Sequence, residues 1–245
     1  MKHVLIVGRE GSGKTALIRQ LTRELRGCAI DGFLTEELRE GQELLGVWLS
    51  RLDGRDALLA HRRLDSPYRV GPLKVNVPLL DEAATRVVRR AIDHSLLLFI
   101  DEIGPVELCS QTLQQALQEA IINGPRVVAT GDIQPLPFLD ALKRRKDVEL
   151  VPLSATTWQP VFEELRARLA ALCDEDERVR TLQQQADRIC ELIVAGDVPE
   201  IDVEIQQATL RDAVARLFPE KHALYHLLYE SRFRRLWQQF RQGIP

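Results

Sequence analysis

The stretch Lys2–Thr15, KHVLIVGREGSGKT, decides the fold of this chain. Residues 2–7 form an apolar, largely β-branched run of the kind that makes a buried strand. Residues 8–15 then match the full pattern G-x-x-x-x-G-K-[ST] of a phosphate-binding loop. Residues 16–21 continue with helical spacing, so that the N-terminus of a helix faces the same loop. A strand, a glycine-rich turn and a helix in this order predict an α/β protein that binds the phosphates of a nucleotide.

Each residue type in the loop has a chemical reason. Glycine lets the backbone curl so that successive N–H groups point at phosphate oxygens, with no Cβ in the way. We expect the Lys14 ammonium to contact the β and γ phosphates and the Thr15 hydroxyl to bind Mg²⁺. The positive end of the helix dipole favours the same anion. The predicted phosphate-binding residues are Gly8, Arg9, Glu10, Gly11, Ser12, Gly13, Lys14, Thr15 and Ala16.

A second stretch, residues 95–102 with the sequence SLLLFIDE, places two carboxylates after a continuous apolar run. Such a run is typical of a strand that is buried on both faces, and open α/β sheets bind ligands at the carboxyl ends of their strands. We expect Asp101 to hold Mg²⁺ through water and Glu102 to polarise the attacking water. The alternative is an ordinary acidic helix cap. A further buried strand, residues 126–130, ends in Thr130, whose hydroxyl we expect to sense the γ-phosphate.

The remaining pattern completes an α/β domain. Residues 29–60 predict a meander of antiparallel strands at the edge of a parallel sheet, with strands at 29–35, 45–52 and 57–60 and a charged turn at 36–41. Further along, the predicted helices are 79–92, 111–122, 139–145 and 158–172, and the last strand is 148–153. The predicted fold is therefore a mostly parallel sheet with helices on both faces and an antiparallel edge.

Composition narrows the class of protein. A formal net charge of −3 over 245 residues gives no general attraction to nucleic acid or to membranes. The apolar run Leu96–Ile100 is far too short to span a bilayer, and the N-terminus lacks the apolar segment of a signal peptide. The four cysteines lie far apart without a C-x-x-C pair, which favours reduced thiols over a zinc site or disulfide frame. We therefore expect a cytoplasmic protein.

Three segments carry a resemblance to a known family. They are Ile30–Gly41 (IDGFLTEELREG), Arg69–Gly71 (RVG) and Ile100–Gln111 (IDEIGPVELCSQ), and Arg144–Ser154 also resembles the last strand of the family. Together they resemble the small P-loop nucleoside-triphosphatase family first described from thermophiles, over about the first 172 residues. The resemblance implies a RecA-like sheet and slow hydrolysis of ATP, GTP and other nucleoside triphosphates with Mg²⁺ as cofactor.

The chain also departs from that family. Members usually carry two arginines after the charged turn, where this chain has Gln42–Leu44. If those arginines neutralise charge in the transition state, another must replace them, and Arg39 is the first internal candidate, with Arg69 the second. The family tends to have Asn-Arg after the last strand, where this chain has Thr156–Trp158. We therefore expect weak discrimination among bases, with Trp158 either stacking on the base or starting the last core helix.

The resemblance does not cover the C-terminal part of the chain. An acidic run at 174–177 suggests a solvated boundary, so we expect an NTPase domain at 1–173 and a helical segment at 174–245. Amphipathic helices are predicted at 179–193, 208–218 and 223–240, with a connector at 199–203. This segment is interpreted as a cap packed on the NTPase domain, as a homodimerisation or partner-docking module, or, least favoured, as a nucleic-acid binder through its arginines, which are Arg232, Arg234, Arg235 and Arg241.

Three functions remain open from the sequence. The leading one is hydrolysis of the bond between the β and γ phosphates, with Lys14 and Arg39 assisting Glu102. A nucleoside or nucleotide kinase shares the phosphate loop, and Asp31 or Glu36 would then line the acceptor site. The third is a nucleotide-dependent switch whose output is a partner bound by the C-terminal helices.

Overall fold

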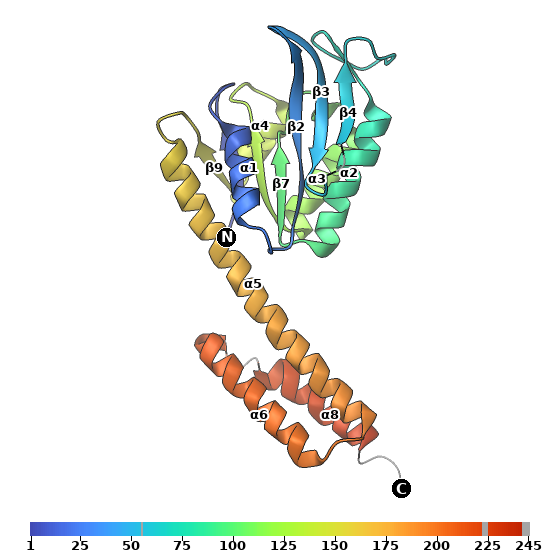
Figure 1. The fold of residues 1–245 in the computed structure, drawn as a ribbon, viewed down its shortest axis with the longest axis vertical. Helices are drawn as coiled ribbons and strands as arrows, with labels where there is room; N and C mark the ends of the chain where they lie inside the picture. Colours follow the sequence, from blue (N-terminus) through green and yellow to red (C-terminus); the bar gives the residue numbers. More distant parts are fainter. Residues whose placement is uncertain (55, 222–224, 242–245) are drawn as a thin grey trace. The chain divides into compact units, whose positions relative to one another are not determined.

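The computed structural model describes residues 1–54, 56–221 and 225–241 of the chain (Figure 1). Contacts within the chain separate two units, Met1–Cys173 and Asp174–Pro245. The first unit holds one nine-stranded sheet in the order β5-β6-β4-β3-β2-β7-β8-β1-β9. The second unit is helical. None of the helices in the described ranges is both long enough and apolar enough to cross a membrane.

Five neighbouring strands of the sheet are parallel and carry the loops of interest. They are β2 (Ile30–Glu40), β7 (Leu97–Asp101), β8 (Arg126–Gly131), β1 (His3–Val7) and β9 (Val148–Pro152). The antiparallel part adds β3 (Glu43–Arg51), β4 (Asp56–His61), β6 (Leu73–Val75) and β5 (Arg69–Val70). The predicted parallel sheet with an antiparallel edge meander is confirmed.

Helices cover both faces of this sheet, because its central strands are apolar on both sides. On β1, Leu5 belongs to one core cluster, together with residues of α2 (Val77–His94) and α3 (Gln111–Asn123). Its neighbours Val4 and Ile6 belong to a second cluster, with residues of α1 (Lys14–Glu24) and α5 (Trp158–Ala195). Alternate residues of a strand point to opposite faces, so a continuous apolar run is what a strand between two helical layers requires. The short helix α4 (Pro137–Lys143) precedes β9.

The charged segment after Thr35 is not the turn that its composition predicted. Glu36–Glu40 stays in β2, paired with β3 in the register Glu36↔Trp48 and Glu40↔Glu43, with an irregularity between Leu38 and Arg39. The chain reverses instead at Gly41, where φ is 60°. Cross-strand hydrogen bonding therefore overrides the turn preference of a charged run, and β2 extends past the end of β7, where Leu34 pairs with Asp101.

The prediction of four reduced cysteines is wrong for two of them. Cys28 and Cys173 form a disulfide with a Cα–Cα distance of 5.6 Å, although 145 positions separate them in sequence. Cys109 is half-buried and Cys190 is buried, both as free thiols. Sequence spacing cannot show such a pair, because the fold brings the segment after α1 beside α5.

The second unit has a core of its own. After α5 come α6 (Glu200–Leu217), the 3₁₀ turn η2 (Pro219–Lys221), the π-helical turn η3 (His226–Glu230) and α8 (Ser231–Phe240). Helix α6 starts at Glu200, so the predicted connector at 199–203 is wrong beyond its first residue. Residues 222–224, which include the start of the predicted helix 223–240, lie outside the described residues. The buried members of this core are Leu182, Ala186, Ile189, Cys190, Ile193, Val203, Leu210, Val214, Tyr225 and Phe233.

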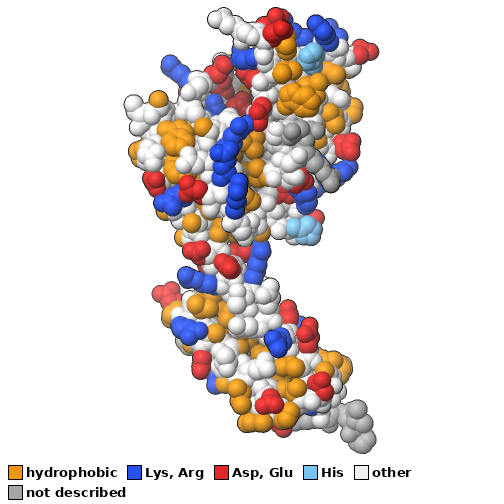
Figure 2. Space-filling view, in the orientation of Figure 1, with side chains coloured by type: hydrophobic (Ala, Val, Ile, Leu, Met, Phe, Trp, Pro, Cys, Tyr) orange, Lys and Arg blue, Asp and Glu red, His pale blue; other side chains and the backbone are white. Residues whose placement is uncertain are grey.

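Apolar side chains also lie on the surface of this unit (Figure 2). Ile201 and Ile205, one turn apart on α6, are 59% and 57% exposed, and Leu227 on η3 is 69% exposed. Exposed apolar side chains are ordinary on a protein surface, so these residues alone do not identify a partner. A docking or dimerisation role for residues 174–245 therefore stays a prediction.

Candidate active site

The phosphate loop folds around the Lys14 side chain. Lys14 is the first residue of α1, and its Nζ donates to the carbonyl oxygen of Gly8 at 2.9 Å and to that of Arg9 at 3.4 Å. Gly11 and Gly13 have φ angles of 76° and 90°, a conformation that is strained for residues with a Cβ. The loop therefore arches over a buried ammonium group, with the N-terminus of α1 directed into it. This is the arrangement that the sequence predicts for triphosphate binding.

Trp158 packs against the same loop from the start of α5. Its Nε1 donates to the carbonyl oxygen of Gly13 at 3.1 Å, and its ring stacks on Phe162 with a centroid distance of 5.5 Å. A Cβ on Gly13 would lie 2.9 Å from the indole Cδ1, so only glycine fits there. These contacts favour the interpretation in which Trp158 begins a core helix and supports the loop.

The carboxylate of Asp101 is buried at the carboxyl end of β7. It is 2% exposed, and the hydroxyl of Thr130, at the same level of β8, donates to its Oδ1. The other oxygen, Oδ2, is buried and has no hydrogen-bond partner among the described residues. Thr130, which was expected near the γ-phosphate, thus has its hydroxyl directed at Asp101. An ionised carboxylate with one unpaired oxygen in a buried position is costly unless a cation completes it.

The surroundings of Asp101 suit a divalent cation. Burial raises the pKa of Asp101, while the hydroxyls of Thr130 and nearby Thr15 and the charges of Lys14 and Arg19 lower it. No group of three or more His, Cys, Asp or Glu that could hold a metal occurs in the described part of the chain. Mg²⁺ at nucleotide sites usually takes one or two protein ligands and completes its shell with phosphate oxygens and water. Thr15 and Asp101 fit that ligand set.

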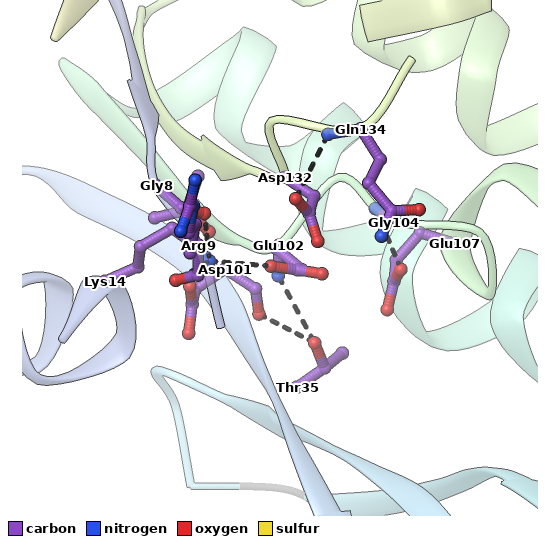
Figure 3. A network of polar contacts seen from close by, with 11 residues as sticks. Gly8, Arg9, Lys14, Thr35, Asp101, Glu102, Gly104, Glu107, Asp132 and Gln134 are labelled. Carbon is purple, nitrogen blue, oxygen red and sulfur yellow. Dashed lines mark hydrogen bonds and ion pairs between the residues drawn. The ribbon is translucent and has the colours of Figure 1, made fainter. Parts of the chain in front are cut away.

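Glu102 lies beside Asp101 and faces the loop (Figure 3). Its Oε2 is 3.8 Å from the Lys14 Nζ, and its side chain is 34% exposed, so water can reach it. The Glu102 N–H donates to the hydroxyl of Thr35 at 3.2 Å, and that hydroxyl donates to the carbonyl oxygen of Asp101 at 2.9 Å. Burial raises the pKa of Glu102, Lys14 lowers it, and neighbouring acids, including Asp132, raise it further.

The structure separates the two arginine candidates. Arg39 extends from β2 to the phosphate loop, where its NH2 lies 3.3 Å from Glu10 Oε1 and its Nε 2.5 Å from Glu37 Oε2. Arg69 lies on β5, the edge strand, with six strands between it and β1. Arg39 is therefore next to the loop and Arg69 is not.

Several polar residues of the site were not predicted. Arg19 pairs with Glu36 and acts electrostatically on Asp101. Its place four residues after Thr15 on α1 could have identified it, since such residues share a helix face. Thr35 ends the predicted strand 29–35, and Glu107 lies in a segment that was recognised as family resemblance, but neither residue was given a role. Glu107 stands between Val106 and Leu108, and an acid between apolar residues is the signal that could have identified it.

Of the two residues expected to line a kinase acceptor site, Glu36 pairs with Arg19 near the phosphate loop, whereas Asp31 does not lie at the site. Asp31 is at the start of β2, and its two oxygens bind Arg90 at 2.6 and 2.8 Å. In the β2–β7 register it lies three residues before Leu34, the partner of Asp101, so it is at the opposite end of the strand from the site. A cavity of about 600 Å³ lies at that far end, lined in part by Asp31, Arg90 and His94.

Comparison with known proteins places this unit in context. The model of the family described as NTPase matches residues 3–166. The nucleoside-triphosphatase THEP1 of Thermotoga maritima is 37% identical over 162 residues, which are 66% of this chain and 92% of the relative. The human cancer-related nucleoside-triphosphatase is 33% identical over 165 residues, covering 61% of this chain and 86% of the relative.

Solved structures agree with the sequence comparison. The crystal structure of THEP1 from Aquifex aeolicus has a TM-score of 0.59 at 26% identity, covering 66% of this chain and 96% of that one. The solution structure of a human cancer-related nucleoside triphosphatase has a TM-score of 0.58 at 28% identity, covering 70% and 98%. The match to the family model ends before the second unit begins.

Proposed function

Because the chain belongs to the NTPase family, it hydrolyses nucleoside triphosphates, and we propose that it does so slowly, with Mg²⁺ and with weak discrimination among bases. Weak discrimination is supported by Trp158, whose indole N–H is already bound to Gly13 and which begins a core helix. In addition, the sequence after β9 contains no Asp- or Asn-rich motif of the kind that selects guanine.

The observation that carries the proposal is the buried Oδ2 of Asp101 beside the phosphate loop, which has no hydrogen-bond partner within the described part of the chain. Thr15 and Asp101 would hold the cation, and Mg²⁺ bound there would neutralise charge on the β and γ phosphates. Lys14 and the backbone N–H groups of residues 11–14 would hold the same phosphates. Several carboxylates crowd this site, so the triphosphate needs such cations to enter it at all.

Glu102 is assigned the role of general base. It would accept a proton from water while the water oxygen attacks the γ-phosphorus, and the bond from that phosphorus to the bridging β-γ oxygen breaks. The nucleoside diphosphate leaves with the electron pair of that bond. Its partial exposure lets Glu102 contact the water, and Lys14 at 3.8 Å favours its ionised form.

Slow turnover is expected because the site lacks the arginine pair that is usual in the family. An arginine that stabilises the transferred phosphoryl group is worth roughly 10³–10⁵ in rate. The pair usual in the family is absent at Gln42–Leu44, and Arg39 is engaged with Glu37 and Glu10. Arg39 would have to leave these exposed pairs to act.

Phosphate release from ATP, GTP, CTP and UTP, with Mg²⁺ or with a chelator, tests the proposal. Glu102→Gln should reduce turnover about 10²–10⁴-fold with nucleotide binding retained. Asp101→Asn should weaken Mg²⁺-dependent binding, because the charge that opposes the cation is lost. Glu119→Gln, on the exposed face of α3, is the matched control. Parent-level turnover in Glu102→Gln would refute the assigned base, and phosphate transfer to added nucleosides would revive the kinase alternative.

A further inference from the structure

Glu107, the first residue of the 3₁₀ turn η1 (Glu107–Cys109), has a buried carboxyl group with no ion-pair partner among the described residues. It is 3% exposed, and its Oε2 accepts a hydrogen bond from the Gly104 N–H at 3.1 Å. Within the described chain, no Lys, Arg or His is among the groups that act on it most strongly. A buried carboxylate that lacks a countercharge is much costlier than a neutral carboxylic acid. Glu107 is therefore expected to carry a proton in the folded protein.

Glu107 and Glu102 face each other across Gly104 (Figure 3). A Cβ on Gly104 would lie 2.9 Å from Glu107 Oε2 and 3.0 Å from Glu102 Oε1, so both carboxyl groups border this glycine. Any side chain at Gly104 would displace one of them. Thr35 completes the cluster, because its hydroxyl binds the Glu102 N–H and also acts on Glu107. Glu102 and Glu107 therefore share the neighbours Gly104 and Thr35 and act electrostatically on each other.

We propose that Glu107 is a positioning residue for hydrolysis, which as an uncharged carboxylic acid fixes the Gly104 turn behind Glu102 and, when ionised, inactivates the enzyme. The proposal rests on the role assigned above to Glu102. Ionisation of Glu107 would bury a second negative charge beside Glu102, and no Lys, Arg or His among the described residues forms an ion pair with Glu107 to offset it. The charge would repel Glu102 from its position and repel the incoming triphosphate.

The electrostatic surroundings support this proposal. Burial is the main cause that raises the pKa of Glu107, to about 8, and the charge of Glu102 raises it further. The N–H groups of Glu107 and Gly104 and the hydroxyl of Thr35 oppose the rise. On η1 itself, the other titratable group is Cys109, whose pKa is raised by burial and by Glu107. Glu107 is therefore neutral at pH 7 and ionises within the range in which the protein can be assayed.

The kinetic test is the pH dependence of kcat/KM for Mg·ATP in the full chain, because this ratio reports ionisations of the free enzyme. The parent and Glu119→Gln should lose kcat/KM about tenfold per pH unit above about pH 8. Glu107→Gln, which keeps the shape and cannot ionise, should be active at neutral pH and should lack this decline. An unchanged decline in Glu107→Gln, or a parent profile that stays flat, would overturn the proposal.

A direct titration keeps the proposal testable if the variant folds poorly. The ¹³C resonance of the Glu107 carboxyl carbon in the parent protein should move with a midpoint near 8, and a midpoint near its ordinary value of 4.5 would overturn the proposal. The same titration separates the two hypotheses. If Glu102→Gln retains parent turnover while Glu107 titrates near 8, the assignment of Glu102 as base fails and the charge state of Glu107 stands.

Discussion

Replacing Glu107 with Gln should change the pH dependence of stability in a direction fixed by linkage. The carboxyl has a pKa of about 8 in the folded state and close to 4.5 once unfolded. Between these values the folded protein holds a proton that the unfolded chain releases, so the free energy of unfolding falls as pH rises. Below about pH 4.5 and above about pH 8 both states hold the same number of protons, and this contribution is constant.

The magnitude follows from the shift. Each pKa unit corresponds to about 1.4 kcal/mol, so a shift from 4.5 to about 8 lowers stability by roughly 4–5 kcal/mol across the window. The amide that replaces the carboxyl in Glu107→Gln cannot ionise and contributes no slope. The difference between parent and variant isolates this carboxyl, because the other titrating groups occur in both proteins. The difference in the free energy of unfolding, parent minus variant, should therefore be largest at low pH and should decrease towards pH 8.

Urea unfolding, monitored by pulsed hydrogen exchange of the β7 and β8 amides, measures the free energy of unfolding of the first unit alone. This matters because two units with separate cores need not unfold together. Glu119→Gln should track the parent at every pH. A parent-minus-variant difference that stays constant from about pH 5 to about pH 8 would show that Glu107 does not hold a proton, and would refute the reasoning.

Three further outcomes are expected. Thr130→Val should cost about 1–3 kcal/mol of stability and raise the Mg²⁺ concentration needed for phosphate release, because Asp101 loses its buried donor; chemical unfolding and a metal titration measure the two effects. Trp158→Phe should cost about 1 kcal/mol through its lost bond to the phosphate loop while nucleotide affinity stays similar, since the ring is assigned to the core. Cys28→Ser should cost about 2–5 kcal/mol in thermal unfolding, and reductant should then have no further effect; Cys109→Ser is the control.

The sequence could predict those parts of the site that are recognised from residues adjacent in the chain. The phosphate loop and the pair Asp101-Glu102 are read from adjacent residues, and their positions follow once each is recognised at the end of a strand. The parallel order of β7, β8 and β1 then brings them to one edge. Their roles remain predictions until variants are assayed.

The unpredicted part of the site depends on burial and on long-range pairing. Glu107 is one of 36 acidic residues, and its apolar neighbours Val106 and Leu108 suggest burial, but only the fold shows that it lies beside Gly104. Thr35 meets Asp101 across 66 positions of sequence through the β2–β7 pairing. The disulfide between Cys28 and Cys173 is of the same kind. No spacing rule identifies such contacts before the fold is known.

Helix α5 shows why composition misplaced a helix end. The acidic run 174–177 suggested a break, yet one helix extends over Trp158–Ala195. A run of charged residues indicates exposure to solvent, but it does not end a helix. Glycine and proline are the residues that disfavour helix, and neither occurs between Val161 and Ala195. Asp176 even supports the helix through an ion pair with Arg180 at 2.8 Å. The segment that the family model leaves unmatched therefore begins inside regular structure, and a boundary chosen by charge alone would divide a helix.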